Sequence, residues 1–188
     1  MKILFVRHGE PCYDNVKRLN LVSYLGELTP RGISQAENVA NDNRFLDAEI
    51  IISSPYTRAL QTASIISRKT QIPLIVDAMF HEWLQDKSHI STLDPTYGKA
   101  AYHEFLDNEF EHNSNCVCNW ESASELAKRA FEGMNKYYEM GYKKIIVVAH
   151  SVFIRTFGYS EPDLKHCEVY EYEFDKNSCY NGIVPWKG

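Results

Sequence analysis

Apolar residues occur mainly in short runs that are separated by longer amphipathic stretches. Three runs are almost continuous: residues 2–6 (KILFV), 49–53 (EIIIS) and 143–150 (KKIIVVAH). Runs of this kind are typical of strands buried on both faces of a parallel sheet. The shorter run 73–76 (PLIV) predicts another strand, and the alternating run 169–174 (VYEYEF) predicts an edge strand.

The stretches between these runs have helical periodicity. Thr29 followed by Pro30 predicts a helix that continues to about residue 45, and Ser54 followed by Pro55 predicts a second helix by the same cap-then-proline pattern. Further helices are expected near residues 102–110, over 122–140 and directly after residue 150. Strands that alternate with helices imply βαβ units. We therefore expect an α/β fold, a three-layer α/β/α sandwich with a mostly parallel central sheet.

The length and the uniform organisation of the chain favour one domain. With 188 residues, 44% of them hydrophobic, the chain can bury one sizeable core. We found no repeat, low-complexity tract or Gly/Ser linker, so a single domain is expected over residues 1–188. Residues 83–120 are irregular, acidic and aromatic, and they are expected to form a lid-like insert.

Hydropathy and net charge indicate where the protein is located and which classes of partner it can bind. No apolar run approaches the ~18 residues of a membrane span, and the N-terminal run is shorter than the ~7–15 residues of a signal-peptide core, so a cytoplasmic protein without membrane association is expected. The net charge is −5 and no basic block is present, which argues against nucleic acid as a partner. The sequence gives no indication of oligomeric state.

The cysteines indicate neither disulfides nor a metal centre. There are five, an odd number, scattered along the chain. Cys116 and Cys118 follow His103 and His112, but this spacing matches none of the common zinc patterns. No metal and no organic cofactor are therefore expected.

Cationic and imidazole side chains gather where the predicted strands end. Arg7 and His8 follow the first strand, His150 ends the strand of residues 143–150, and Arg58 lies early in the helix after the second strand. The carboxyl ends of parallel strands form the ligand-binding edge of such sheets. Two arginines and two histidines suit an oxyanion such as phosphate. A single histidine at a strand end is nevertheless more often structural than catalytic, so position alone leaves both interpretations open.

The motifs around these residues decide between them. RHGE at residues 7–10, LTPRGISQA at 28–36, SSPYTRALQTA at 53–63 and VVAHS at 147–151 resemble, in order, the histidine phosphatase superfamily, the phosphoglycerate-mutase-like group. HEWLQDK at 81–87 and WESASELAKR at 120–129 look like later blocks of its small bacterial phosphatase branch. The RHG and SSPYTRALQTA blocks are highly specific.

This resemblance implies a mechanism and a set of residues. His8 is expected to be the nucleophile that forms a phosphohistidine, and Arg7, Arg58 and His150 are expected to surround the phosphoryl oxygens. Glu82 matches the family's proton donor, and its neighbour His81 is the main alternative for that role. The expected activity is hydrolysis of a small phosphorylated metabolite without a metal.

The chain also departs from the family pattern. Many relatives have an asparagine soon after RHGE that contacts phosphate, whereas here Asn15 comes one residue later than in the mutases and is a weaker candidate. The usual glycine after the second histidine is Ser151, which keeps the backbone N–H donor and is expected to narrow the pocket.

Two other functions have to be weighed against hydrolysis. Mutases of this family carry an adjacent basic pair in the insert, whereas residues 81–121 here hold eight acidic residues, two lysines and no arginine. Such a segment repels a second phosphate. A non-catalytic module that binds a phosphorylated ligand is the other alternative, and the presence of all five expected catalytic residues argues against it.

Overall fold

A single twisted sheet forms the centre of the computed structural model, which describes residues 1–18, 23–88, 95–161 and 163–179. The strand order is β5-β4-β6-β1-β7. The strands are β1 (Lys2–Arg7), β4 (Ile50–Ser53), β5 (Leu74–Val76), β6 (Lys144–Ala149) and β7 (Val169–Glu173). All neighbours pair in parallel except β7, which is antiparallel to β1 at one edge. The mostly parallel sheet and its edge strand are confirmed.

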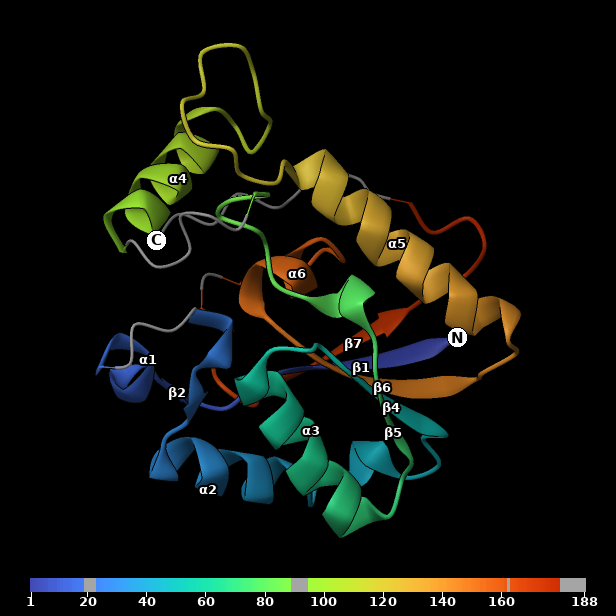
Figure 1. Ribbon diagram of the computed structural model, residues 1–188. Coiled ribbons are helices and arrows are strands. Elements are labelled where there is room, and N and C mark those ends of the chain that lie inside the picture. Colours follow the sequence, from blue (N-terminus) through green and yellow to red (C-terminus); the bar gives the residue numbers. More distant parts are fainter. Residues whose placement is uncertain (19–22, 89–94, 162, 180–188) are drawn as a thin grey trace.

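Helices cover both faces of this sheet, as Figure 1 shows. On one face lie α2 (Pro30–Val39) and α3 (Thr57–Thr70), and on the other lie α5 (Ala123–Glu139) and the short α6 (Ser151–Arg155). The three-layer sandwich is therefore also confirmed. No helix in the described ranges is both long and apolar enough to cross a membrane.

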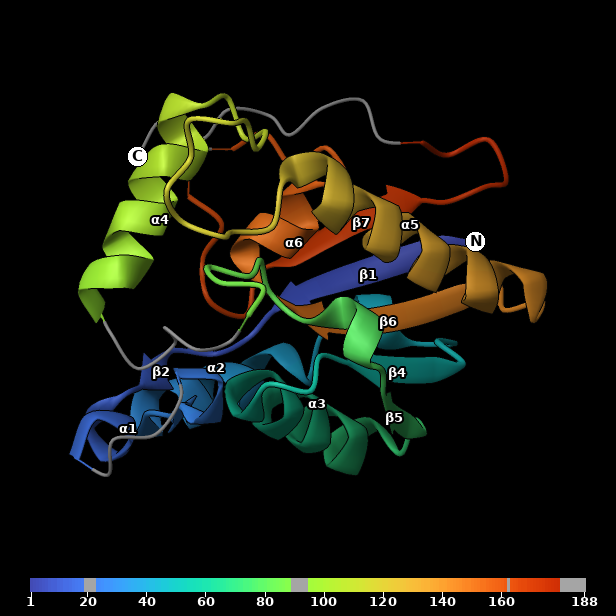
Figure 2. The same ribbon diagram turned by 45° about the horizontal axis from the view of Figure 1, so that its top comes forward.

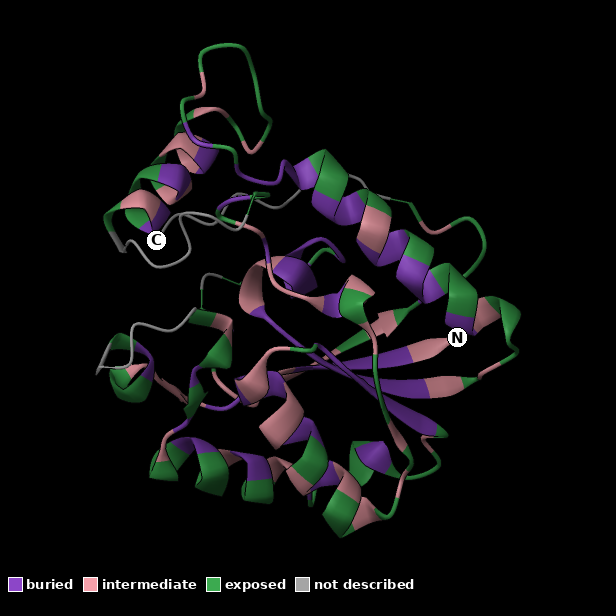
Figure 3. Cartoon of the chain, in the orientation of Figure 1, coloured by how far each residue is buried: buried purple, intermediate pink, exposed green. Residues whose placement is uncertain are grey.

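The continuous apolar runs follow from burial on both faces. In β1, Ile3 and Phe5 contribute to the core under α5 and α6, whereas Leu4 and Val6 contribute to the core under α2 and α3. All four side chains are fully buried. Figure 3 shows the same division, with buried strands at the centre and exposed residues on the outer sides of the helices.

Two helix starts follow the capping rules. The Thr29 side chain accepts a hydrogen bond from the N–H of Gly32, and Pro30 occupies the first turn of α2. At α5, Ser122 and Glu125 form a reciprocal capping box. Both helices therefore begin at about the positions that the sequence predicts.

The predicted start of α3 is wrong. The helix begins at Thr57 with Tyr56 as its N-cap, and no side chain caps it. Ser54 directly follows β4 and extends its hydrogen bonding to β6, because its N–H donates to the carbonyl of Val148 (3.0 Å). The strand's hydrogen bonding therefore continues through the position where Ser54 was expected to cap a helix.

Other predicted boundaries also need correction. The helix after Thr29 ends at Val39, and residues 43–45 form a separate 3₁₀ turn, η2 (Asn43–Phe45), capped by Asp42. In the insert, α4 spans Pro95–Asp107 and not residues 102–110. It ends there because Glu109 and Phe110 adopt positive φ angles (54° and 70°), which no α-helix contains.

Small elements complete the chain between the main ones. These are α1 (Asp14–Arg18), the 3₁₀ turns η1 (Ser23–Leu25) and η3 (Ala78–Phe80), and the antiparallel pair β2 (Pro11–Cys12) with β3 (Glu27–Leu28). The sequence pattern did not predict this small two-stranded sheet.

The carboxyl ends of β1, β4 and β6 lie at one edge of the sheet, between two groups of elements. Figures 1 and 2 both show α4 on the α5 side of this edge and α1 with β2 on the α2 side. The expected lid over residues 83–120 includes α4, but residues 89–94 lie outside the described residues. Its action as a lid stays a prediction, as does the single-domain organisation.

A close contact between two glycines fixes the loop after β1 against α2. A Cβ atom added at Gly9 would lie 2.6 Å from the carbonyl oxygen of Gly32, and a Cβ added at Gly32 would overlap the backbone of Glu10. Both added Cβ atoms would meet backbone atoms, so neither could be accommodated unless the backbone moved. The start of α2 thus holds the residues that directly follow His8.

We therefore expect Gly32→Ala to push this loop away from α2. The free energy of unfolding should fall by about 1–3 kcal/mol, the usual cost of overpacking, and it can be measured by urea denaturation. Ser34→Ala is the matched control, because Ser34 is exposed on the same helix. Equal stability of the two variants would show that the contact imposes no constraint.

Candidate active site

His8 and His150 face each other across one buried arginine. Their ring centroids are 5.1 Å apart. Arg58 Nε donates to His8 Nε2 (3.1 Å), and Arg58 Nη2 lies 3.3 Å from His150 Nδ1. The arrangement follows from the sheet, because the N–H of His8 donates to the carbonyl of Ala149 (3.0 Å) next to His150. The sequence prediction that these three side chains converge is confirmed.

Hydrogen-bond partners set the tautomer of each ring. His8 Nδ1 donates to the carbonyl oxygen of Gly9 (2.7 Å), so its Nε2 keeps the lone pair. His150 Nδ1 accepts from Arg58, so its proton lies on Nε2, which faces the Ser54 hydroxyl (2.7 Å). Burial, and next the Arg58 cation, hold the pKa of both histidines well below the usual value. Both rings are therefore neutral near pH 7.

Arg7 adds a second cation beside His8. Its Nη1 donates to the carbonyl oxygen of Leu164. Its Nε is buried and has no hydrogen-bond acceptor among the residues that the structure describes. An arginine nitrogen that is buried without an acceptor is costly, and an oxyanion would supply the missing acceptor.

Glu82 is held by backbone groups at the start of α6. Its Oε1 accepts from the N–H of Phe153 (3.0 Å) and of Trp83 (2.9 Å), and its Oε2 accepts from the N–H of Val152 (3.2 Å). Burial raises the pKa of this carboxyl above the usual glutamate value, although the N–H groups and Arg58 oppose the shift. The carboxyl therefore tends to stay protonated at a higher pH than an exposed glutamate.

His81, the alternative proton donor, has a different environment. Its Nδ1 donates to the carbonyl oxygen of Glu82 (2.7 Å), and its ring stacks on Tyr56 with the centroids 6.3 Å apart. The carboxyl of Glu82, by contrast, lies at the N–H groups of α6, one and two residues from Ser151. The choice of Glu82 over His81 as proton donor stays a prediction.

The two weaker candidates are placed differently. Ser151 is the first residue of α6 and lines a pocket beside Arg7. Asn15 lies exposed on α1 (Asp14–Arg18). Contact of either residue with substrate remains a prediction.

A pocket of about 410 Å³ opens next to the site. One wall comes from α4 and the residues after it, another from α6 and a third from the segment before β7. It is lined by Arg7, Tyr102, Phe105, Leu106, Phe110, Ser151, Val152, Arg155, Asp163 and Leu164. Arg7, which lies beside His8, and Ser151, which follows His150, both line this pocket, so the pocket adjoins the two histidines.

Several residues around the histidines were not singled out from the sequence. Tyr56 packs under the Arg58 guanidinium (5.1 Å) and edge-on to His150 (5.0 Å). The Thr62 hydroxyl accepts from the N–H of Gly9 (3.0 Å). Tyr56 and Thr62 lie in the SSPYTRALQTA block, which is a signal that could have found them.

His166 was missed for a different reason. Its ring centroid lies 5.6 Å from that of His8, yet it belongs to no recognisable motif. Only the folded chain brings the segment before β7 over β1, so no sequence pattern marks it.

The donor set suits an anion better than a cation. Arginine and backbone N–H groups dominate, and no group of three or more His, Cys, Asp or Glu side chains that could hold a metal occurs in the described parts of the chain. Near the cysteines once considered for zinc, His112 Nε2 donates to the carbonyl of Cys118 (2.9 Å). That nitrogen is therefore used by the backbone.

Comparison with known proteins gives the same picture. The family profile described as histidine phosphatase superfamily (branch 1) matches residues 3–184. A Schizosaccharomyces pombe protein named "Probable phosphatase C1620.13" is 30% identical over 165 residues, which are 80% of this chain and 53% of that protein. "Probable phosphoglycerate mutase GpmB" of Proteus mirabilis is 27% identical over 156 residues, 81% of this chain and 70% of that protein.

A solved structure extends the likeness to the fold. Bacillus stearothermophilus YhfR superposes with a TM-score of 0.70 at 21% identity, covering 97% of this chain and 95% of that one. The profile match spans nearly the whole chain, in agreement with the motifs and the clustered residues. The chain belongs to the histidine phosphatase superfamily.

Proposed function

We propose that the protein hydrolyses phosphate monoesters of small metabolites through a phosphohistidine on His8. One observation carries this proposal: Arg58 bridges a neutral His8 and His150 while Arg7 presents a buried N–H beside them. Cations around a neutral nucleophile suit attack on a phosphoryl group.

In the first step, His8 Nε2 attacks phosphorus and the bond to the ester oxygen breaks. Arg7 and Arg58 stabilise the charge on the three equatorial oxygens, and His150 orients Arg58 by accepting from its Nη2. Glu82 gives its proton to the departing oxygen, so the organic part leaves as a neutral alcohol. Gly9 already holds the proton of the other ring nitrogen, and the Nε2 lone pair becomes free for attack when Arg58 Nε moves its hydrogen bond from His8 to a phosphoryl oxygen.

In the second step, water attacks the phosphohistidine. Glu82, now ionised, takes a proton from this water, the N–P bond breaks, and inorganic phosphate is released. His8 recovers its neutral form and Glu82 recovers its proton. Both steps balance without a metal or a cofactor, because the arginines supply the charge that a metal supplies elsewhere.

The pocket beside Arg7 suits the organic part of the ester. The N–H groups of Val152 and Phe153 hold Glu82, and Val152 also lines the pocket. An alcohol that leaves toward Glu82 therefore enters this space. About 410 Å³ is near the lower end of the range of small-molecule pockets, which fits a small phosphorylated metabolite.

Mutase activity and simple binding are the alternatives. The relatives include proteins named as a phosphatase and as a phosphoglycerate mutase. The acidic segment 81–121 disfavours a bisphosphorylated ligand, so we place hydrolysis first. Intact His8 and Glu82 disfavour a module that only binds. A cytoplasmic location and the absence of nucleic-acid partners stay predictions from the sequence.

The anion site predicts stabilisation by inorganic phosphate. At phosphate concentrations of 100 times Kd, the free energy of unfolding should rise by about 2.7 kcal/mol, as measured by thermal or urea denaturation. Arg58→Gln should remove this effect. Arg31→Gln is the control, because the Arg31 side chain is 76% exposed. Stabilisation that persists without Arg58 would place the anion elsewhere.

The role of Glu82 predicts a dependence on the leaving group. An aryl phosphate with a good leaving group scarcely needs a proton donor, so Glu82→Gln should slow phosphorylation by alkyl phosphates about 10²-fold or more and by activated aryl phosphates far less. With the aryl substrate, phosphohistidine should accumulate after a burst of product. The assays are run in excess chelator, where wild-type activity is expected to persist.

His81→Gln serves as the control for this experiment, and it should show neither the selective loss nor the burst. If Glu82→Gln slows both substrate types equally and gives no burst, another residue is the proton donor.

The shifted pKa values predict a rate optimum on the acidic side of neutrality. His8 must be neutral to attack, and its lowered pKa keeps it so below pH 6.5, where an ordinary histidine is protonated. Glu82 must be protonated to act as acid, and its raised pKa extends that form upward in pH. For an alkyl phosphate, kcat/KM should therefore fall on both sides of this range.

With an activated aryl phosphate, kcat/KM should still fall at acidic pH but should not fall at alkaline pH, because this substrate does not need the proton donor. Both substrates carry a phosphate group that ionises in this pH range. A difference between their two pH profiles therefore reports the ionisation of Glu82 and not that of the phosphate. An alkaline fall of equal size with both substrates would contradict the assignment.

A further inference from the structure

The segment that carries Glu82 belongs to no strand or helix. It follows η3 and runs irregularly toward the insert. The carbonyl groups of His81 and Glu82 therefore lack the ladder partners that a strand would provide, and so does that of Met79 within η3. A proton donor on such a segment needs another means of fixing its backbone.

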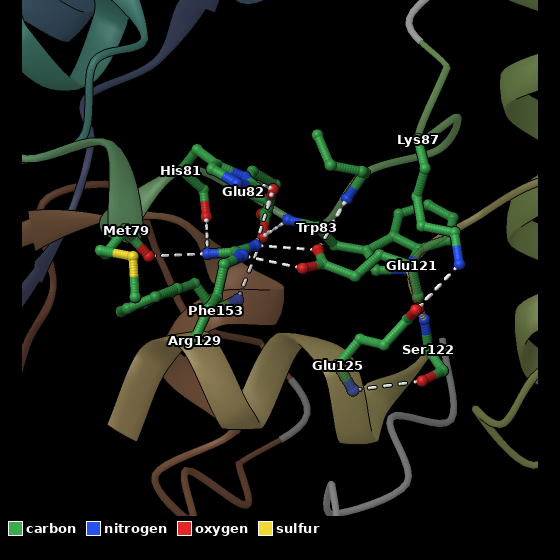
Figure 4. A network of polar contacts seen from close by, with 11 residues as sticks. Met79, His81, Glu82, Trp83, Lys87, Glu121, Ser122, Glu125, Arg129 and Phe153 are labelled. Atoms are coloured by element: carbon green, nitrogen blue, oxygen red, sulfur yellow. Dashed lines mark hydrogen bonds and ion pairs between the residues drawn. The ribbon is translucent and has the colours of Figure 1, made fainter. Parts of the chain in front are cut away.

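Arg129 of α5 supplies these contacts. Its Nη1 donates to the carbonyl oxygens of Met79 (2.8 Å) and His81 (2.9 Å), and its Nη2 donates to that of Glu82 (3.2 Å). Figure 4 shows the guanidinium in the middle of the three carbonyls. One rigid planar group on the long helix α5 thus holds the backbone both before and after the end of η3.

Glu121 fixes the guanidinium in turn. Its Oε1 accepts from Arg129 Nε (2.7 Å) and its Oε2 from Arg129 Nη2 (2.8 Å), in the paired geometry of a strong ion pair. The Glu121 side chain is 6% exposed and that of Arg129 is 14% exposed. Every N–H-bearing nitrogen of the guanidinium thus has at least one acceptor, and its orientation is set.

Glu121 also binds the segment directly. Its Oε2 accepts from the N–H of Leu84 (3.1 Å), its own N–H donates to the carbonyl of Leu84 (2.9 Å), and its carbonyl accepts from the indole of Trp83 (2.6 Å). The residues just after Glu82 are therefore held by the same pair that holds those before it.

We propose that Arg129, oriented by Glu121, is the positioning residue for the proton donor Glu82. Arg129 fixes the backbone of the segment, while the start of α6 fixes the carboxylate, so the carboxyl is located from both ends. The inference rests on the proposed role of Glu82. Arg129 itself touches no reacting atom, so its effect on proton transfer passes through Glu82.

The geometry requires arginine and not only a positive charge. The acceptors are three carbonyl oxygens and two carboxylate oxygens spread around one plane. A lysine has one nitrogen with three donors and cannot reach all of them. Arg129→Lys therefore keeps the charge opposite Glu121 and loses the fixed geometry.

The test measures phosphorylation of the enzyme by an alkyl phosphate and by an activated aryl phosphate, for wild type, Arg129→Lys and Glu82→Gln. We expect Arg129→Lys to slow the alkyl reaction by about tenfold or more, part of the range that a proton donor supplies, with the aryl reaction within about threefold of wild type. A role that is merely structural would slow both reactions alike.

Lys136→Met is the matched control. Lys136 lies on the same helix and pairs with Asp77 (3.0 Å), just before the segment, but contacts none of its carbonyls. It should leave the ratio of the two rates unchanged. Circular dichroism checks that each variant is folded.

Glu121→Gln gives an independent variant that keeps Arg129 and its carbonyl contacts but weakens its orientation. A smaller selective loss with alkyl phosphate is expected. The positioning role is wrong if Glu82→Gln is selective for alkyl phosphate while Arg129→Lys and Glu121→Gln slow the two substrates equally or not at all. If Glu82→Gln itself shows no selectivity, the proposed function fails and the inference fails with it.

Discussion

The register between β1 and β6 is the constraint on which the site depends. Arg7 pairs with Ala149 across the two strands. The residue that follows each of them, His8 or His150, therefore lies at the same edge of the sheet. The hydrogen bond from the His8 N–H to the Ala149 carbonyl continues this pairing for one residue. A shift of one residue would turn the side chains to opposite faces. Such a shift would also remove Phe5 from its ring contacts with Phe153 and Phe157 on the α5 and α6 side.

A parallel sheet sets the position of the proposed nucleophile, and hydrogen bonds from α5 and α6 set that of the proposed acid. His8 and His150 directly follow β1 and β6, and Arg58 lies in the first turn of α3, the helix after β4. Glu82 reaches the same edge on an irregular segment, held by a guanidinium from α5 and by N–H groups of α6. The first arrangement depends on backbone pairing, and the second on long-range polar contacts.

This difference explains what the sequence could predict. The sheet, its layers and the convergence of the two histidines with Arg58 were predictable, because apolar runs and motifs are local signals. The start of α3 was not, since Ser54 continues the strand's hydrogen bonding and binds His150 instead of capping a helix. His166 and the contacts of Glu82 were not predictable either, because they join segments that are far apart in the chain.

The two cores on the faces of the sheet divide the molecule in one more way. The α2 and α3 side supplies Arg58 and supports the loop after His8, whereas the α5 and α6 side supports Glu82 and, through α4, the walls of the pocket. If the pocket holds the alcohol as proposed, we expect insertions or exchanges in α4 and its flanking loops to change which alcohol fits while Arg58 and the loop after His8 stay in place. The sheet therefore lets the pocket walls diverge between relatives while the side that supplies Arg58 stays constant, and Glu82, which lies on the pocket side, has to suit each new alcohol.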